Sequence, residues 1–537
     1  MVGRLDRGAS RADPTRTMTT IDGVAASPPP PGTLDAPADA FAILRDALAA
    51  AKYDEPTVSA RLGVPSLYDV KRLADGRKTL ASTPEDANAV LVRLFIDSET
   101  LPTAVVERLL GSDVLAALHV LGLVAPAAGV DASLSATAML YPTQGLWLAS
   151  DRQPMRAADL ALLPQDYVFS ALSSLTQQYL DVLPDAPRGR VLELCAGTGV
   201  AALRAVRRGA AEAWATDIAR RCVEFIRFNA RLNDVADRVR AVESDAWSAL
   251  GAETFDLVVA HPPYVPALSH RFDFRDAGAD GEQVARRIVE DLAAHVRPGG
   301  RYVMRAALSD RRGAAIATRV REWLGTGGDE FDVVVLEHGV YGPMEAYRAV
   351  TKGGKDFVDC EQWLRHFDAL GIEGFAVTLV EMRRDAAGRA PLTERRVAGR
   401  APDARAIDWV FRWARRVASM GATPEARLGG QRPRVVPGVR LAVHLESDAS
   451  GAWANVGAGV ETGWPTHNVV KAPPLAPTLL ELCNGTRDVT AILAGLREAG
   501  LVSEDVTRGD VAHLVEVLAA AGAVELPDCP IPEAGNA

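Results

Sequence analysis

The chain has 537 residues, of which 48% are hydrophobic and 24% are charged, and its formal net charge is −10. This length exceeds what one hydrophobic core usually serves, so we expect several domains in a globular protein. No long uninterrupted apolar run is present, which argues against a membrane-spanning helix, and the acidic charge argues against non-specific wrapping of nucleic acid.

The N-terminal segment and the cysteines indicate the cellular setting. Residues 1–37 contain the run Pro28–Pro31 and lack the apolar stretch of a secretory signal, so they predict a disordered tail. None of the five cysteines forms a Cys-x-x-Cys pair, and no histidine cluster has zinc-ligand spacing. We therefore expect a reduced, cytoplasmic protein with no metal site.

Between residues 38 and 125, apolar residues recur at helical spacing and predict several short helices, a pattern that resembles a winged-helix unit. Nine Lys and Arg residues stand against twelve Asp and Glu residues between Ala38 and Val124. Winged helices that bind DNA are usually basic, so this balance favours packing or substrate selection over DNA binding. A β-rich connector is predicted over residues 126–164.

From residue 165 to residue 385, short apolar strands alternate with helices, which predicts an α/β fold with a mostly parallel sheet and helices on both faces. An amphipathic helix over 165–183 is expected to lead into this domain. Seven strands are predicted, at Val191–Leu194, Ala213–Thr216, Val239–Glu243, Phe255–Ala260, Arg301–Arg305, Phe331–Leu336 and Phe375–Val380.

The C-terminal part changes in charge and pattern. Residues 386–437 predict an Arg-rich helical linker, and Arg395–Arg440 holds eleven arginines against three acidic residues. A helix face with ion pairs and a surface for phosphates both fit this stretch, so a weak nucleic-acid contact stays open. Residues 438–530 predict a small α+β, winged-helix-like domain. Its part Leu475–Leu526 resembles the peptide-chaperone winged helix of pyrroloquinoline quinone biosynthesis.

A glycine-rich turn follows the first strand of the central domain. Gly197 and Gly199 lie between the strand that ends at Leu194 and a helix that starts near Val200. Glycine lets the backbone approach a cofactor closely, and the helix N-terminus offers free N–H groups. Nicotinamide-binding folds share this spacing. We include Glu193 and Cys195, next to the turn, among the candidate cofactor-binding residues.

Acidic residues follow the next two strands. Asp217 can accept hydrogen bonds from both hydroxyls of a ribose, or cap a helix N-terminus. Asp245 can accept from an adenine amine while the Ala246 N–H meets a ring nitrogen, or it can be a simple turn residue. Together with Ile218, which follows Asp217, these residues complete the candidate cofactor-binding set.

Two consecutive prolines follow the fourth strand, in His261-Pro262-Pro263-Tyr264. Prolines end a strand ladder and fix the chain at the crevice where ligands of open α/β sheets bind. These four residues are therefore the candidate catalytic residues.

The motif resembles the Asn-Pro-Pro-Tyr tetrapeptide of amino-methyltransferases. With Ala215–Ala219, Phe228–Asn233 and Arg275–Gly281, the stretch 188–305 is similar to release-factor glutamine methyltransferases and to the "small-domain" superfamily that also includes ribosomal-RNA guanine methyltransferases. The resemblance implies a class I, Rossmann-like methyltransferase sheet of seven strands, with S-adenosylmethionine as cofactor. It also implies N-methylation of an amide or amine on a protein, an RNA base or a small molecule.

In that family the first side chain of the tetrapeptide and the first proline carbonyl hold the target N–H groups, and the aromatic ring packs on the target. The present chain departs from the pattern, because His261 replaces Asn. A neutral imidazole can accept one hydrogen bond and, unlike an amide, can also take up a proton. The alternatives are an S-adenosylmethionine-binding protein with altered chemistry at His261 and an NAD-dependent oxidoreductase, which would not explain the prolines.

Overall fold

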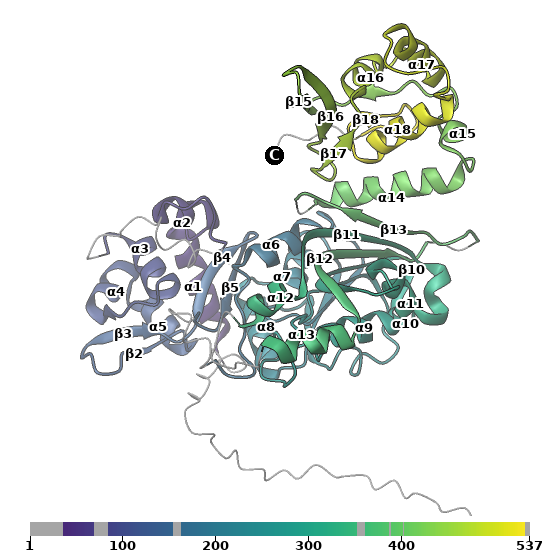
Figure 1. Cartoon of the computed structure of the whole chain (residues 1–537). Coiled ribbons are helices and arrows are strands. Elements are labelled where there is room, and N and C mark those ends of the chain that lie inside the picture. Colours follow the sequence, from purple (N-terminus) through teal and green to yellow (C-terminus); the bar gives the residue numbers. More distant parts are fainter. Residues whose placement is uncertain are drawn as a thin grey trace, which may run out of the picture.

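The computed structural model describes residues 36–68, 84–153, 163–351, 360–385, 388–400 and 402–531. Figure 1 shows an N-terminal helical unit, a central sheet with its helices, and a C-terminal unit. The predicted disordered tail lies outside the described residues, apart from residues 36 and 37. None of the helices in these ranges is long and apolar enough to cross a membrane.

The central sheet has eight strands in the order β13-β11-β12-β10-β9-β6-β7-β8. Their bounds are β6 (Arg190–Leu194), β7 (Glu212–Asp217), β8 (Val239–Glu243), β9 (Phe255–Ala260), β10 (Val296–Arg311), β11 (Asp332–Tyr341), β12 (Ile372–Arg383) and β13 (Thr393–Val397). Neighbouring strands are parallel except for β12, which is antiparallel to both β10 and β11. The predicted mostly parallel α/β sheet with helices on both faces is therefore confirmed.

The number of strands differs from the expected seven because β13 is an additional edge strand beside β11. It lies in the segment that the sequence pattern predicted as a helical linker. Its sequence Thr-Glu-Arg-Arg-Val is too polar to predict a buried strand, and charged residues are typical of sheet edges. Arg395 of β13 pairs with Asp310 and Glu337, which holds the strand in place by tertiary contacts.

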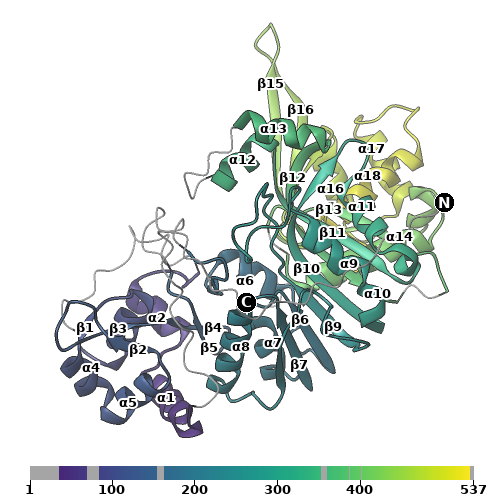
Figure 2. The ribbon, with the colours of Figure 1, turned by 90° about the horizontal axis from the view of Figure 1, so that it is seen from below.

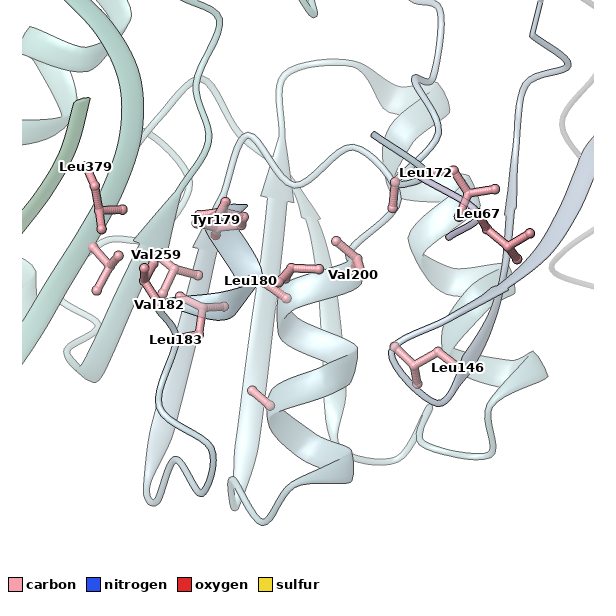
Figure 3. Packing of buried hydrophobic residues seen from close by; sticks show 14 of the residues in the cluster. Leu67, Leu146, Leu172, Tyr179, Leu180, Val182, Leu183, Val200, Val259 and Leu379 are labelled. Atoms are coloured by element: carbon pink, nitrogen blue, oxygen red, sulfur yellow. The ribbon is translucent and has the colours of Figure 1, made fainter. Parts of the chain in front are cut away.

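Helices cover both faces of the sheet. They are α6 (Ser174–Asp181), α7 (Val200–Arg207), α8 (Arg220–Leu232), α9 (Gln283–Glu290), α10 (Leu292–His295), α11 (Ile316–Trp323), the 3-10 helix Gly325–Glu330, α12 (Pro343–Thr351) and α13 (Cys360–Ala369). Alternate residues of the central strands belong to two separate apolar clusters, one on each face. Figure 3 shows α6 on one of these faces, with Tyr179 and Leu180 near Val200 of α7, Val259 of β9 and Leu379 of β12.

The helix predicted over 165–183 is shorter than expected, because α6 begins after its N-cap Ser173. Residues before it are held by distant groups instead of a helical ladder. The Val168 N–H donates to the Asp151 carboxylate at 2.8 Å, and the Ala171 N–H donates to the Tyr141 hydroxyl at 2.8 Å. These tertiary hydrogen bonds override the local helical periodicity and lay the segment along the cavity described below.

The N-terminal unit consists of short helices and a small sheet. Its elements are α1 (Ala38–Ala50), α2 (Glu55–Leu62), α3 (Ala87–Leu91), the π-helix Val92–Ile96, β1 (Leu101–Pro102), α4 (Thr103–Leu110), α5 (Ser112–Val120), β2 (Val124–Pro126) and β3 (Ser133–Ala136). The hairpin of β4 (Met139–Thr143) and β5 (Leu146–Ser150) connects it to α8, because Asn229 accepts from the Ala149 N–H at 2.7 Å.

The C-terminal unit begins with α14, which packs on the sheet. Its elements are α14 (Ala404–Ser419), α15 (Pro424–Leu428), β14 (Arg434–Val435), β15 (Arg440–Ser447), β16 (Trp453–Glu461), β17 (Val469–Ala472), α16 (Ala476–Leu482), α17 (Val489–Glu498), α18 (Arg508–Ala520) and β18 (Val524–Glu525). Figures 1 and 2 place the N-terminal and C-terminal units at opposite ends of the central sheet. The domain boundaries expected from the sequence stay predictions.

Ion pairs account for much of the Arg-rich stretch. Seven of its arginines pair with carboxylates: Arg395, Arg396, Arg405, Arg415, Arg416, Arg427 and Arg434. Several of these pairs fix α14 and the C-terminal helices, such as Arg415 with Asp332 of β11 and Arg427 with Glu516 of α18. The structure thus supports the ion-pair interpretation for these side chains, and the nucleic-acid contact stays a prediction.

Candidate active site

A cavity of about 580 Å³ lies at the carboxyl ends of β6, β7, β8 and β9. This volume is within the roughly 300–1,000 Å³ typical of small-molecule sites. Eleven of the twelve residues predicted from the sequence line it: Glu193, Cys195, Gly197, Asp217, Ile218, Asp245, Ala246, His261, Pro262, Pro263 and Tyr264. Local motifs that are separated along the chain therefore come together in one cavity.

The two glycines of the turn have different roles. Gly197 lines the cavity with φ +53°, and a Cβ atom added there would meet no atom within 4 Å. Gly199 does not line the cavity. Its φ is +76°, and an added Cβ would lie 2.9 Å from Leu203 and 3.1 Å from Ile226. Gly197 thus leaves the backbone open to a ligand, whereas Gly199 allows α7 and α8 to pack closely.

Glu193 holds the start of α7. Its buried carboxylate accepts hydrogen bonds from the N–H groups of Ala201 at 3.2 Å and Ala202 at 2.8 Å. Carboxylates are favourable at helix N-termini because free N–H groups point outward there. Burial raises the pKa of Glu193 to about 8, while these two hydrogen bonds act in the opposite direction. Glu193 therefore lines the cavity, but both of its side-chain oxygens accept hydrogen bonds from N–H groups of α7.

Asp217 links the glycine turn to the next strand. One carboxylate oxygen accepts from the Gly197 N–H at 2.9 Å and the other from the Ala219 N–H at 3.0 Å. The N-cap residue of α8 is Ala219, so the alternative in which Asp217 itself is the N-cap of this helix is wrong. Burial raises the pKa of Asp217, and both hydrogen bonds oppose that shift. A carboxylate has about four acceptor positions, and the Cys222 thiol takes a further one, so one remains for a ligand hydroxyl.

The rim beside Asp217 contains two residues in an unusual backbone conformation. Cys195 has φ +54° and Ala246 has φ +49°, which are rare values for residues other than glycine. Both line the cavity, together with Asp245, whose carboxylate pairs with Arg287 at 2.8 Å. Such conformations are costly and concentrate at functional sites, which supports the assignment of this cavity.

His261 lies between two aromatic rings. Its ring centroid is 5.9 Å from that of Tyr264, at an interplanar angle of 17°, and 5.5 Å from that of Tyr179 of α6. Burial, with a smaller contribution from the Arg305 charge, lowers the pKa of His261 to about 3. The imidazole is therefore uncharged at neutral pH and has one bare nitrogen that can accept a hydrogen bond.

The loop after Tyr264 folds back beneath the motif. The Val265 N–H donates to the Arg275 carbonyl at 2.9 Å, and the Ala277 N–H donates to the Val265 carbonyl at 3.0 Å. Gly281 has φ +77°, and a Cβ atom there would lie 2.7 Å from the Tyr264 carbonyl oxygen. The similar stretch Arg275–Gly281 noted in the sequence thus supports the catalytic motif from below.

Several cavity residues were not predicted from the sequence. Tyr179 comes from α6, and Phe169 and Phe274 stack with centroids 5.7 Å apart at 24°. No motif marks these aromatic residues, because they come from segments that lie far apart in the sequence. The Ser173 N-cap is the one local signal that could have shown that the segment around Phe169 precedes the helix.

Residues 160–310 match the family model described as methyltransferase small domain. The chain is 26% identical to the release factor glutamine methyltransferase of Gloeobacter violaceus, over 28% of this chain and 61% of that protein. It is 32% identical to the release factor glutamine methyltransferase of Xylella fastidiosa, with 34% and 66% covered. The ribosomal protein uL3 glutamine methyltransferase of Bradyrhizobium diazoefficiens is 33% identical, with 21% and 38% covered. The chain thus spans less than two thirds of the length of each of these curated relatives.

Proposed function

We propose that this chain, whose residues 160–310 form a class I methyltransferase small domain, transfers the methyl group of S-adenosylmethionine to a planar nitrogen in a protein. The observation that carries the proposal is the His261 ring stacked on the Tyr264 ring at the wall of a cavity that also contains the Gly197 turn. An acceptor site and a cofactor site therefore share one enclosed space.

The cavity residues fit the cofactor. Gly197 leaves room where a side chain would intrude, and Asp217 keeps an acceptor position for a ribose hydroxyl. Ile218, 55% exposed at the cavity rim, provides an apolar surface for an adenine ring, beside Asp245 and Ala246. The bound cofactor supplies an electrophilic methyl group on a sulfonium centre.

The residues of the tetrapeptide prepare the acceptor. The lone pair of an amide nitrogen is conjugated, and a hydrogen bond accepted from its N–H localises that lone pair on nitrogen. A His261 with a pKa of about 3 is a weak base, so it acts as a hydrogen-bond acceptor in place of Asn. As the N–CH3 bond forms and the S–CH3 bond breaks, the proton of the nitrogen therefore leaves to solvent and is not held on His261. The Pro262 carbonyl serves as a second acceptor, and the Tyr264 ring orients the planar group.

We infer that the acceptor is a glutamine side-chain amide. The relatives named above are glutamine methyltransferases of a release factor and of ribosomal protein uL3. RNA is less favoured as acceptor, because seven arginines of the Arg-rich stretch already pair with carboxylates. The flanking units then select which protein presents the glutamine.

The test is methyl transfer from labelled S-adenosylmethionine to protein and RNA fractions of a cell extract, with the wild-type chain and two variants. His261→Asn keeps a hydrogen-bond acceptor, so it should retain labelling of the protein fraction. His261→Ala should lose roughly 100-fold in rate, because the acceptor amide is no longer oriented. Cofactor binding by the wild-type chain without any labelled product would refute the enzyme and support the alternative of a binding protein with altered chemistry.

A further inference from the structure

A buried arginine lies directly behind the tetrapeptide. The parallel ladder pairs Met304 of β10 with Ala260 of β9, so Arg305 and His261 are the next residues on neighbouring strands. Arg305 is 1% exposed, and its Nη2 donates to Gln178 Oε1 of α6 at 3.2 Å. Among the described residues its Nε and Nη1 form no hydrogen bond of good geometry, although the Tyr264 hydroxyl lies close enough to stabilise the guanidinium. Within the described ranges, no carboxylate forms an ion pair with it.

A second, half-buried side chain completes the cluster. His338 of β11 lies with Nε2 at 3.0 Å from Gln178 Oε1. A guanidinium can only donate, so the Gln178 atom that faces Arg305 must be the oxygen, and His338 must donate to it through Nε2. The Nδ1 atom of His338 is then a bare acceptor, and it is buried without a partner. The hydrogen bonds to Gln178 thus hold Arg305 and His338 in place, while other polar atoms of these two side chains form no hydrogen bond of good geometry.

This arrangement lowers the stability of the fold, and a role in the site would explain why it is present. A buried charge without a counter-ion costs stability, and buried polar atoms in proteins are nearly always paired. The groups that face Arg305 are instead aromatic hydroxyls, since Tyr264 and Tyr341 both stabilise its charged form. The groups around His261 are Tyr179 from α6, Tyr264 from its own loop and Arg305 from β10.

We propose that Arg305 is a positioning residue for methyl transfer, which acts on the His261 and Tyr264 side chains from behind the tetrapeptide. The inference rests on the function proposed above. Burial and, as the smaller cause, the nearby guanidinium disfavour a positive charge on His261, so that the ring keeps a bare nitrogen for the acceptor N–H. The guanidinium also holds the Tyr264 side chain in position, and the ring of Tyr264 orients the acceptor. Arg305 acts through these two side chains and does not line the cavity itself.

The test is a pH titration of His261 by nuclear magnetic resonance in the full-length chain with 13C-labelled histidine. The chain has nine histidines, and the spectrum of His261→Ala assigns the signal. In the wild-type chain the His261 signal should not titrate between pH 5 and pH 8. Arg305→Met should raise its titration midpoint, whereas Arg305→Lys should keep it low because the charge is retained. Methyl transfer should fall roughly 10-fold or more in Arg305→Met.

Matched controls separate this role from a structural one. Arg416 of α14 is also buried, with an Nη1 that has no hydrogen-bond partner, but it lies outside the cavity. Arg416→Met should leave the His261 titration unchanged, even if it lowers the melting temperature. An unchanged His261 midpoint in a folded Arg305→Met variant would overturn the inference. If neither the wild-type chain nor any variant transfers a methyl group, the proposed function is refuted instead. The two outcomes can be told apart because the titration does not depend on an acceptor.

Discussion

The two halves of the cavity differ in how their polar groups are satisfied. In the half around the glycine turn, Glu193 and Asp217 bond to backbone N–H groups that are 2 to 20 residues away in the chain. In the half behind the tetrapeptide, Arg305 and His338 come from different strands and keep buried atoms without partners. Backbone hydrogen bonds make the first half a rigid template, while the second half depends on side chains from distant elements.

This difference matches the two ligands proposed for the cavity, the cofactor and the methyl acceptor. A template of backbone groups suits a cofactor that never changes, because its geometry follows from the fold. Side chains whose polar atoms lack hydrogen-bond partners suit an acceptor that differs between relatives, because a few substitutions can change these side chains. The following variants test whether the halves act separately.

The largest effect is expected for Tyr264→Ala. Loss of the ring leaves the acceptor poorly oriented, so turnover should fall roughly 100-fold while cofactor affinity is unchanged. Calorimetry with S-adenosylmethionine and a labelled-transfer assay measure the two quantities separately. A parallel loss of cofactor binding would mean that Tyr264 supports both halves.

Asp217→Ala should affect the other half. The variant removes the hydrogen bonds from the Gly197 N–H of the turn and from the Ala219 N–H, together with the acceptor offered to the ribose, so cofactor binding should weaken by about 1–3 kcal/mol. Turnover at saturating cofactor should change little, which a rate measurement at several cofactor concentrations resolves. Unchanged affinity would contradict the ribose assignment, and a loss of turnover alone would erase the distinction between the halves.

The smallest effect is expected in the pH dependence of stability. Burial and the Arg305 charge lower the pKa of His261 to about 3 and that of His338 to about 4, from the usual 6.5. Below pH 6.5 the unfolded chain therefore binds protons that the folded chain does not. Stability is complete above that pH and declines as the pH falls toward these values. His261→Asn should show a smaller drop in melting temperature than the wild type between pH 6.5 and pH 4.5, and equal drops would argue against a depressed His261.

Local sequence patterns predicted most of the central sheet and most of the cavity half around the glycine turn. The strands, the Gly197 turn and Asp217 are recognisable because each depends on a few neighbouring residues, and all seven predicted strands are present. The exceptions have a common cause. The charged strand β13 and the segment before α6 take their structure from distant partners, namely Asp310 and Glu337 in one case and Asp151 and Tyr141 in the other.

The sequence by itself determined the alternation of strands and helices, the glycine turn and the proline-stiffened end of β9, since backbone geometry at these points follows from local residue types. Only the tertiary structure decided that Arg305, His338 and Gln178 meet behind His261. Their contact depends on strand order and on the placement of α6 over the sheet, and neither is encoded in any short stretch of residues. It is also the tertiary structure that lowers the pKa of His261, because burial and a neighbouring charge disfavour its charged form.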